Sequence, residues 1–157
     1  MADDEQVPIS AAHVLATFFD SAPVVGHPSV RARLPRVRGH LLTFLDTEAE
    51  RWLTADELVL VCAERELEPV DAVVRVAGAE LLLAALPAFC RPEWLLPARL
   101  DAGAQLHVAA GLGPWVLECG YLPGAQTRML QERIDLAVAR ARERLDSRPQ
   151  GRPTWGR

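Results

Sequence analysis

Arginine is the residue type in this sequence whose spacing most clearly suggests a binding chemistry. Four arginines and no acidic residue lie between residues 21 and 45, and eight arginines with four acidic residues lie between residues 128 and 157. Clustered guanidinium groups are typical of sites that bind anions or the phosphate backbone of a nucleic acid. The residues that we predict to make such contacts are Arg31, Arg33, Arg36, Arg38, Arg140, Arg144 and Arg148.

The same arginines can also serve an ordinary structural role. The chain contains no lysine, so arginine has to occupy every exposed basic position. Between residues 46 and 71 the balance is reversed, with nine acidic residues and two arginines. This acidic segment can pair with the basic blocks, either within one chain or between two copies. The charge pattern therefore leaves three interpretations open: an anion site, exposed basic surface, and charge pairing.

Several classes of enzyme and cofactor site find no support in the sequence. Without lysine the chain has neither a Walker A phosphate loop nor a Schiff-base lysine. None of its four serines lies in a Gly-x-Ser-x-Gly motif, and no Cys-x-x-Cys or His-Glu-x-x-His spacing offers a metal site. These absences favour a protein that is not an enzyme, and we predict no catalytic residue, cofactor or metal; an enzyme whose site is assembled from residues far apart in the sequence is the third hypothesis, after the two functions given below.

Two weaker constellations have a structural explanation as well as a functional one. Glu57, Glu64 and Glu68 lie near one face of a predicted helix, where acid–base chemistry could use them if the face lined a cleft. A solvated face explains them equally well. His107 and Cys119 could bind the same metal ion only if a hairpin brought them together, and an isolated histidine in a hairpin is usually a surface residue.

The cysteines and the distribution of apolar residues indicate a cytoplasmic protein. Cys62, Cys90 and Cys119 are odd in number and lie in apolar surroundings, so we expect reduced, buried thiols rather than disulfides. No apolar run approaches the roughly 18 residues that a membrane span needs, and the first five residues are acidic rather than basic as in a secretory signal. Lysine and asparagine, which have AT-rich codons, are both absent, and this indicates a GC-rich bacterium.

Two segments near the N-terminus have helical patterns. Ser10 is the predicted N-cap of a helix that runs to Asp20. Apolar residues recur at three- and four-residue spacing between Val30 and Leu45, and Pro35 interrupts this stripe. We expect either a helix that is kinked at Pro35 or a short turn followed by a helix that starts there.

Capping signals and hydrophobicity predict further helices in the middle of the chain. Thr47 with Glu50 and Thr54 with Glu57 both match the capping box, in which the two side chains bond to each other's backbone N–H groups. Residues 70–86 form the most apolar segment of the chain. We predict that this segment is the central buried helix.

The pattern changes in the last third of the chain. Apolar and polar residues alternate on both sides of the turn-forming segment Gly111-Leu-Gly-Pro114. This predicts a β-hairpin over residues 104–121, with a helix over residues 102–110 as the alternative. Residues 126–146, in contrast, carry one apolar stripe on a strongly charged cylinder, which predicts a long amphipathic helix.

These elements predict a mainly α fold. We expect a single compact helical domain over residues 9–146, with about five to six helices and the hairpin placed before the long C-terminal helix. The acidic residues 1–8 and the basic, Pro- and Gly-rich residues 147–157 are predicted to be disordered.

The function that we predict is that of a non-enzymatic helical interaction module. Its partner would be another protein or a second copy of the chain, and no membrane is expected to take part. The apolar stripe of the C-terminal helix is the predicted surface for self-association. The residues of this stripe are Leu130, Ile134, Val138 and Leu145.

The alternative is a DNA-binding protein of the winged-helix type. The predicted order from residue 35 onward, with a capped helix, a buried helix, a hairpin and a long helix, suits that architecture, and the arginine clusters would contact the nucleic acid. Two observations weaken this hypothesis. Residues 70–86, in the recognition position, offer only Asp71, Arg75 and Glu80 to DNA, and the net charge of the chain is −4.

Overall fold

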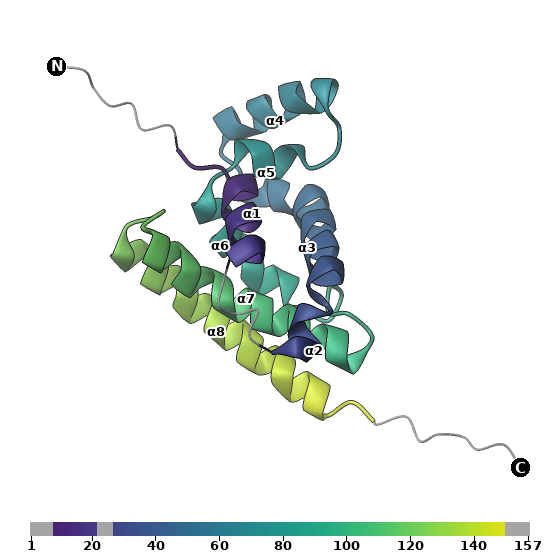
Figure 1. Cartoon of the computed structure of the whole chain (residues 1–157). Helices are drawn as coiled ribbons and strands as arrows, with labels where there is room; N and C mark the ends of the chain where they lie inside the picture. Colours follow the sequence, from purple (N-terminus) through teal and green to yellow (C-terminus); the bar gives the residue numbers. More distant parts are fainter. Residues whose placement is uncertain (1–7, 22–26, 150–157) are drawn as a thin grey trace, which may run out of the picture.

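The structure is a computed structural model that describes residues 8–21 and 27–149. Helices make up most of this part of the chain (Figure 1). The prediction of a mainly α fold is confirmed, because no strand occurs within these residues, but the predicted number of five to six helices is too low, because the described residues form eight α-helices. The elements in chain order are α1 (Ala11–Ser21), α2 (Pro28–Arg31), α3 (Leu34–Glu48), the 3-10 helix η2 (Ala49–Trp52), α4 (Ala55–Leu67), α5 (Ala72–Val76), α6 (Ala79–Phe89), α7 (Arg99–Cys119) and α8 (Gly124–Asp146).

The predicted β-hairpin over residues 104–121 is wrong, because these residues belong to α7 and the turn that follows it. Of the two sequence interpretations, the helix over residues 102–110 is therefore the right one. The helix continues through Gly113 and Pro114 and ends at Gly120, whose φ of 69° is the left-handed conformation typical of a glycine cap.

Neighbouring α8 explains why α7 tolerates two helix-breaking residues. Pro114 has no N–H group, so the carbonyl of Ala110 loses its usual donor four residues later. Gln131 of α8 supplies a replacement, because its Nε2 donates to Ala110 O at 3.4 Å. Gly113 makes this approach possible: a Cβ atom at that position would lie only 1.5 Å from Gln131 Oε1. The apparent turn is thus a contact site between two helices.

Helices α6, α7 and α8 form the base of the fold. Figure 1 shows α7 and α8 running side by side below the other helices, and α8 packs along both α7 and α6. Eight of the eleven residues of α6 are buried in the hydrophobic core. The predicted central buried helix over residues 70–86 is in fact two helices, α5 and α6. The chain is extended between them, where Ala77 O accepts a 2.7 Å hydrogen bond from Ala11 N.

The capping predictions were right at two of three positions. Ser10 caps α1 through a 3.2 Å bond from the backbone N–H of His13. Thr54 and Glu57 form the predicted capping box at the start of α4. Thr47 caps no helix, because α3 runs past it and its hydroxyl donates to a carbonyl one turn earlier in that helix.

Pro35 lies in the first turn of α3, after the short helix α2. A proline costs little there because the first N–H groups of a helix have no partner within the helix. Of the two predicted arrangements, the turn followed by a new helix is therefore close to the observed one.

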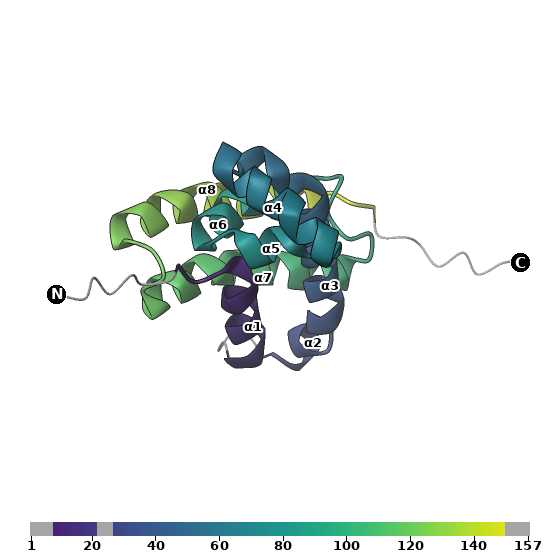
Figure 2. The ribbon, with the colours of Figure 1, turned by 90° about the horizontal axis from the view of Figure 1, so that it is seen from above.

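Helix α4 lies at the edge of the molecule. It is at the top of Figure 1, and Figure 2, which views the molecule from above, shows it lying over α5, on which it mainly packs. Among the described residues, no helix is long and apolar enough to cross a membrane. Of the predicted disordered ends, residues 1–7 and 150–157 lie outside the described residues, whereas Ser147 and Arg148 are described and form hydrogen bonds with the fold.

Candidate functional site: an arginine cleft between α6 and α8

The first predicted arginine group is largely engaged within the fold. Arg36 donates to Asp101 Oδ2 at 2.7 Å, and Arg33 Nε lies 3.4 Å from Asp101 Oδ1. Asp101 is buried in the first turn of α7. Arg38 lies over the ring of Phe19, with 5.6 Å between the guanidinium carbon and the ring centre. Two guanidinium groups thus share the one carboxylate of Asp101, and Arg31 is an exposed residue at the end of α2.

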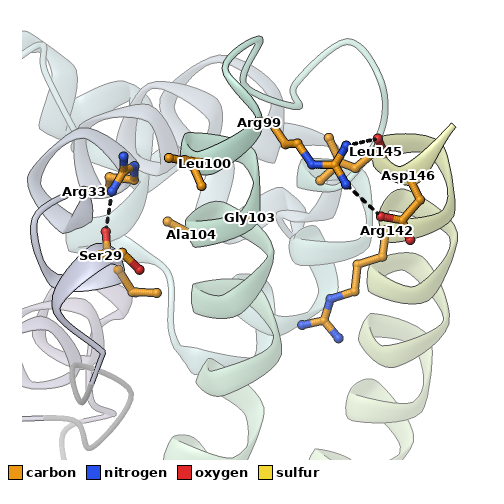
Figure 3. Close-up of a pocket in the computed structure, with 10 residues that line it drawn as sticks. Ser29, Arg33, Arg99, Leu100, Gly103, Ala104, Arg142, Leu145 and Asp146 are labelled. Atoms are coloured by element: carbon orange, nitrogen blue, oxygen red, sulfur yellow. Dashed lines mark hydrogen bonds and ion pairs between the residues drawn. The ribbon is translucent and has the colours of Figure 1, made fainter. Parts of the chain in front are cut away.

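A cavity of about 360 Å³ beside this group is lined by three arginines (Figure 3). Arg33 donates to Ser29 O at 2.7 Å as well as pairing with Asp101. Arg99 donates to Asp146 Oδ1 at 3.2 Å and to Leu145 O at 3.4 Å. Two of the three guanidinium groups therefore already have anionic or carbonyl partners.

The second predicted group divides into two parts. Arg148 donates to the carbonyls of Leu96 and Pro97 at 3.3 and 3.2 Å, so it fixes the end of α8 to the loop before α7. Arg140 and Arg144 instead line a different cavity, of about 300 Å³, between α8 and the end of α6. We call this cavity the arginine cleft, and its lining residues are Pro87, Cys90, Arg91, Arg133, Leu136, Ala137, Arg140 and Arg144.

Four guanidinium groups without a counter-charge distinguish the arginine cleft. Within the described chain, the guanidinium groups of Arg91, Arg133, Arg140 and Arg144 form no hydrogen bond or ion pair with another residue. The lining contains no carboxylate. Like charges gathered around one cavity repel one another, so a bound anion would be attracted by all four.

Helical spacing places three of these arginines together. Arg133, Ala137, Arg140 and Arg144 are separated by four, three and four residues, so they follow one side of α8. The adjacent side carries the predicted self-association residues, which the structure places in the core. Leu130, Ile134, Val138 and Leu145 are 5, 0, 3 and 6 % exposed. The large apolar side chains that α8 exposes are Met129 and Leu136 instead.

A buried glutamine positions the fourth arginine. Gln105 of α7 is fully buried, and its Nε2 donates to Phe89 O at 3.0 Å and to Trp94 O at 2.9 Å. Its Oε1 accepts from Leu96 N at 2.9 Å. These bonds fix the chain on both sides of Arg91, which follows α6 directly. Every polar atom of this buried amide is satisfied, as a stable core requires.

The sequence indicated only part of this site. Arg133 could have been found, since it lies seven and eleven residues before two predicted members on the same side of a helix. Arg91 and Gln105 gave no such signal. Arg91 comes from a separate element, and Gln105 lies in the segment that the alternating pattern assigned to a hairpin.

The cysteines differ in their surroundings. Cys90 in the wall of the cleft is 2 % exposed, and burial raises its pKa to about 12. This thiol is therefore neutral at physiological pH and unsuited to act as a nucleophile. Cys62 and Cys119 are exposed, so the prediction of buried thiols is right for Cys90 alone.

The weaker constellations do not form sites. Glu57 caps α4 and Glu64 accepts a 2.8 Å bond from Arg75, so neither is available for acid–base chemistry. His107 and Cys119 lie twelve residues apart on α7, a rise of about 18 Å, which is too far to share a metal ion. Across the described ranges, no group of three or more metal-ligating side chains occurs.

No protein-family model, curated protein or solved structure matches this chain. The geometry of the arginine cleft is therefore the basis on which a function has to be argued.

Proposed function

We propose that this protein is a non-enzymatic helical interaction module whose arginine cleft binds an acidic surface of a protein partner. The observation that carries the proposal is the set of four guanidinium groups, unpaired within the described chain, around one cavity. Hydrogen bonds between a guanidinium group and a carboxylate are among the stronger ones in proteins and are favoured when both partners leave water together.

The apolar part of the lining supports a protein partner. Pro87, Leu136 and Ala137 lie among the arginines, so the cleft offers apolar contact area as well as charge. Arginine is enriched in protein interfaces, and the buried centre of an interface is more apolar than its rim. A nucleic acid backbone would use the charges but would gain little from these aliphatic side chains.

The lining also supports binding rather than catalysis. It contains no carboxylate or histidine that could act as a general acid or base, and its one thiol is buried and neutral. Arginine remains protonated at all ordinary pH values and cannot transfer a proton. The cleft is therefore suited to hold an anionic group without changing it.

Duplex DNA has less support as a partner. The winged-helix hypothesis depended on a hairpin, and the described residues have a helix in its place. Its recognition segment, residues 70–86, contributes to two largely buried helices. Binding to DNA is therefore an outcome to be tested rather than a second proposal.

The test compares two variants that remove the same charge from the same helix. Arg140→Ser/Arg144→Ser removes two of the four arginines that line the cleft, and Arg128→Ser/Arg142→Ser removes two arginines from other positions on α8. Binding of fluorescent poly-L-glutamate and of a short mixed-sequence DNA duplex would be measured by anisotropy over a salt series. Loss of two charge-assisted hydrogen bonds should weaken binding of the acidic polypeptide by at least about tenfold.

We expect the Arg128→Ser/Arg142→Ser control to bind poly-L-glutamate nearly as well as the wild type. Equal loss in both variants would mean that only net charge matters, and it would overturn the proposal. Tighter, cleft-dependent binding of the DNA duplex would overturn it in favour of a nucleic acid partner.

A further inference from the structure

Helix α4 carries most of its apolar side chains on its exposed side. Within this helix, all of which the structure describes, Val61 alone is buried. Val59 is 68 % exposed and Leu67 is 85 % exposed. Five of the ten large exposed hydrophobic residues in the described chain lie on α4 or in the turn after it, namely Leu58, Val59, Leu60, Leu67 and Val70. Large exposed apolar side chains gathered on one element in this way are typical of a protein interface.

The charged residues of α4 explain how it is attached to the fold. Arg65 forms an ion pair with Glu50 and lies 3.8 Å from Asp46 Oδ1. Glu64 accepts the 2.8 Å bond from Arg75. Arg65 and Glu64 thus attach α4 to the body of the protein, whereas most of its apolar side chains face outward, unlike those of a typical surface helix. We call the exposed side the outer face of α4.

The outer face carries an acidic residue near each end. Asp56, Val59, Ala63 and Glu66 are spaced by three, four and three residues and all are exposed, so they form one stripe. The ten residues from Asp56 to Glu66 correspond to a rise of about 15 Å. The stripe therefore presents two negative charges about 15 Å apart, with small apolar side chains between them.

The arginine cleft has the complementary pattern. Arg133 and Arg144 are separated by eleven residue steps, a rise of about 16.5 Å, and the cleft residues Leu136, Ala137 and Arg140 lie between them. The positive charges at the two ends and the apolar pair between them thus match the outer face of α4 in spacing and sign, and Arg140 adds a third positive charge within the span. Met129 and Leu136 are the exposed large apolar residues of α8.

We propose that the acidic partner of the arginine cleft is a second copy of this chain, whose α4 docks in the cleft by its outer face. This inference rests on the proposed function and names the partner for the same site. Helices α4 and α8 lie apart in Figure 1, and the cleft arginines form no ion pair within the described chain, so the contact joins different copies.

Pairing of two α4 helices is a less suitable use of the same face. In an antiparallel pair Asp56 of one copy would face Glu66 of the other, and in a parallel pair each carboxylate would face its own equivalent. Both arrangements bring like charges together. Docking in the arginine cleft places both carboxylates beside positive charges instead, so the cleft is the better partner for the outer face of α4.

The contact joins unlike surfaces, so it has consequences for the assembly. Each pair of copies keeps one free α4 and one free cleft unless both contacts form reciprocally in a closed dimer. One helix in a cleft buries less area than the roughly 800 Å² per partner of a standard interface. We therefore expect association that depends on protein concentration and weakens with salt.

Charge reversal on each surface provides the decisive experiment. The cleft variant is Arg140→Glu/Arg144→Glu, and the α4 variant is Asp56→Arg/Glu66→Arg. Sedimentation velocity of the full chain should show association of the wild type, while each variant alone should associate at least about tenfold more weakly. An equimolar mixture of the two variants should associate again, because each supplies an intact surface and the reversed charges also match.

Circular dichroism of each variant establishes that it is folded, and Arg128→Ser/Arg142→Ser serves as the control that should still associate. A wild type that is monomeric at every concentration and low salt overturns the inference, as does a cleft variant that still associates alone or a mixture that fails to associate. Retained binding of poly-L-glutamate by a monomeric wild type would leave the proposed function standing, so the two failures are distinguishable.

Discussion

Arginines line a cavity on each side of α8, and their surroundings differ. Around the cavity near α2, Arg33 is paired with Asp101 and Arg99 with Asp146. Around the arginine cleft, four guanidinium groups have no partner in the described chain. The two cavities are similar in size, about 360 and 300 Å³. The difference lies in the acidic residues, so the position of the carboxylates, rather than the density of arginines, decides which cavity can attract an anion.

The largest expected effect is that of Gln105→Leu. The change removes three hydrogen bonds and leaves the Phe89 carbonyl and the Leu96 N–H without partners, while the Trp94 carbonyl keeps its 2.6 Å bond to His40 Nε2; this should lower the free energy of unfolding by about 3 kcal/mol. Because the loop around Arg91 would lose its support, binding of poly-L-glutamate should weaken as well. Chemical denaturation followed by circular dichroism would measure the stability. A variant as stable as the wild type would contradict the assigned role of this amide.

Removal of the shared carboxylate should make the two cavities more alike. Asp101→Asn should lower the free energy of unfolding by about 2 kcal/mol, because it removes the partner of Arg33 and Arg36 and an acidic residue from the first turn of α7. In an Arg140→Ser/Arg144→Ser background the same change should restore some binding of poly-L-glutamate, measured by anisotropy. No gain in binding would show that counter-charge is not what separates the cavities.

Alkaline pH should reveal the buried thiol of the arginine cleft. Burial raises the pKa of Cys90 from about 9 in an exposed thiol to about 12 in the fold, so the folded state keeps this proton to a higher pH than the unfolded state does. The corresponding stability is fully present below pH 9 and is lost between about pH 9 and 12, with a loss of about 1.4 kcal/mol at pH 10.

Denaturation curves from pH 8 to 10.5 would show this loss, and Cys90→Ala should abolish it. The chain has no lysine and a single tyrosine, so few other groups titrate in this range. A thiol-reactive dye should label Cys62 and Cys119 rapidly and Cys90 slowly. Rapid labelling of all three thiols would mean that the wall of the cleft is open.

The smallest expected effect concerns the stability contributed by the arginines themselves. Arg33→Ser/Arg36→Ser should lower the free energy of unfolding by about 0.5 to 1 kcal/mol, since it breaks partly exposed ion pairs. Arg140→Ser/Arg144→Ser should leave it unchanged or raise it slightly at low salt, because repulsion is relieved. Thermal unfolding at low and high salt would measure both. Equal destabilisation by the two pairs would remove the distinction between the cavities.

The sequence was informative where a local pattern decides the structure. The Ser10 cap, the capping box of Thr54 and the long helix over residues 126–146 depend on residues within one or two turns, and all three were predicted correctly. The apolar stripe of α8 was also recognised, although its residues fill the core.

The errors arose where a distant residue decides the structure. Gly113 and Pro114 are typical of a turn, and the sequence alone did not show that Gln131 donates to the carbonyl of Ala110 and fills the space of a side chain at position 113. The arginine cleft was predicted only in part for the same reason. Arg91 joins it from another element, held in place by a glutamine that lies in the misassigned segment.

The contact between Gln131 and the proline-containing turn of α7 also fixes how far along each other the two longest helices can lie. A slip of α8 by one turn, about 5.4 Å, would replace Gln131 with Asp135 or Thr127. The carboxylate of Asp135 would repel the carbonyl of Ala110, and the hydroxyl of Thr127 already bonds to Pro123 O. One side-chain amide thus specifies the register of the helix pair, and with it the height along α6 at which the arginine cleft is assembled.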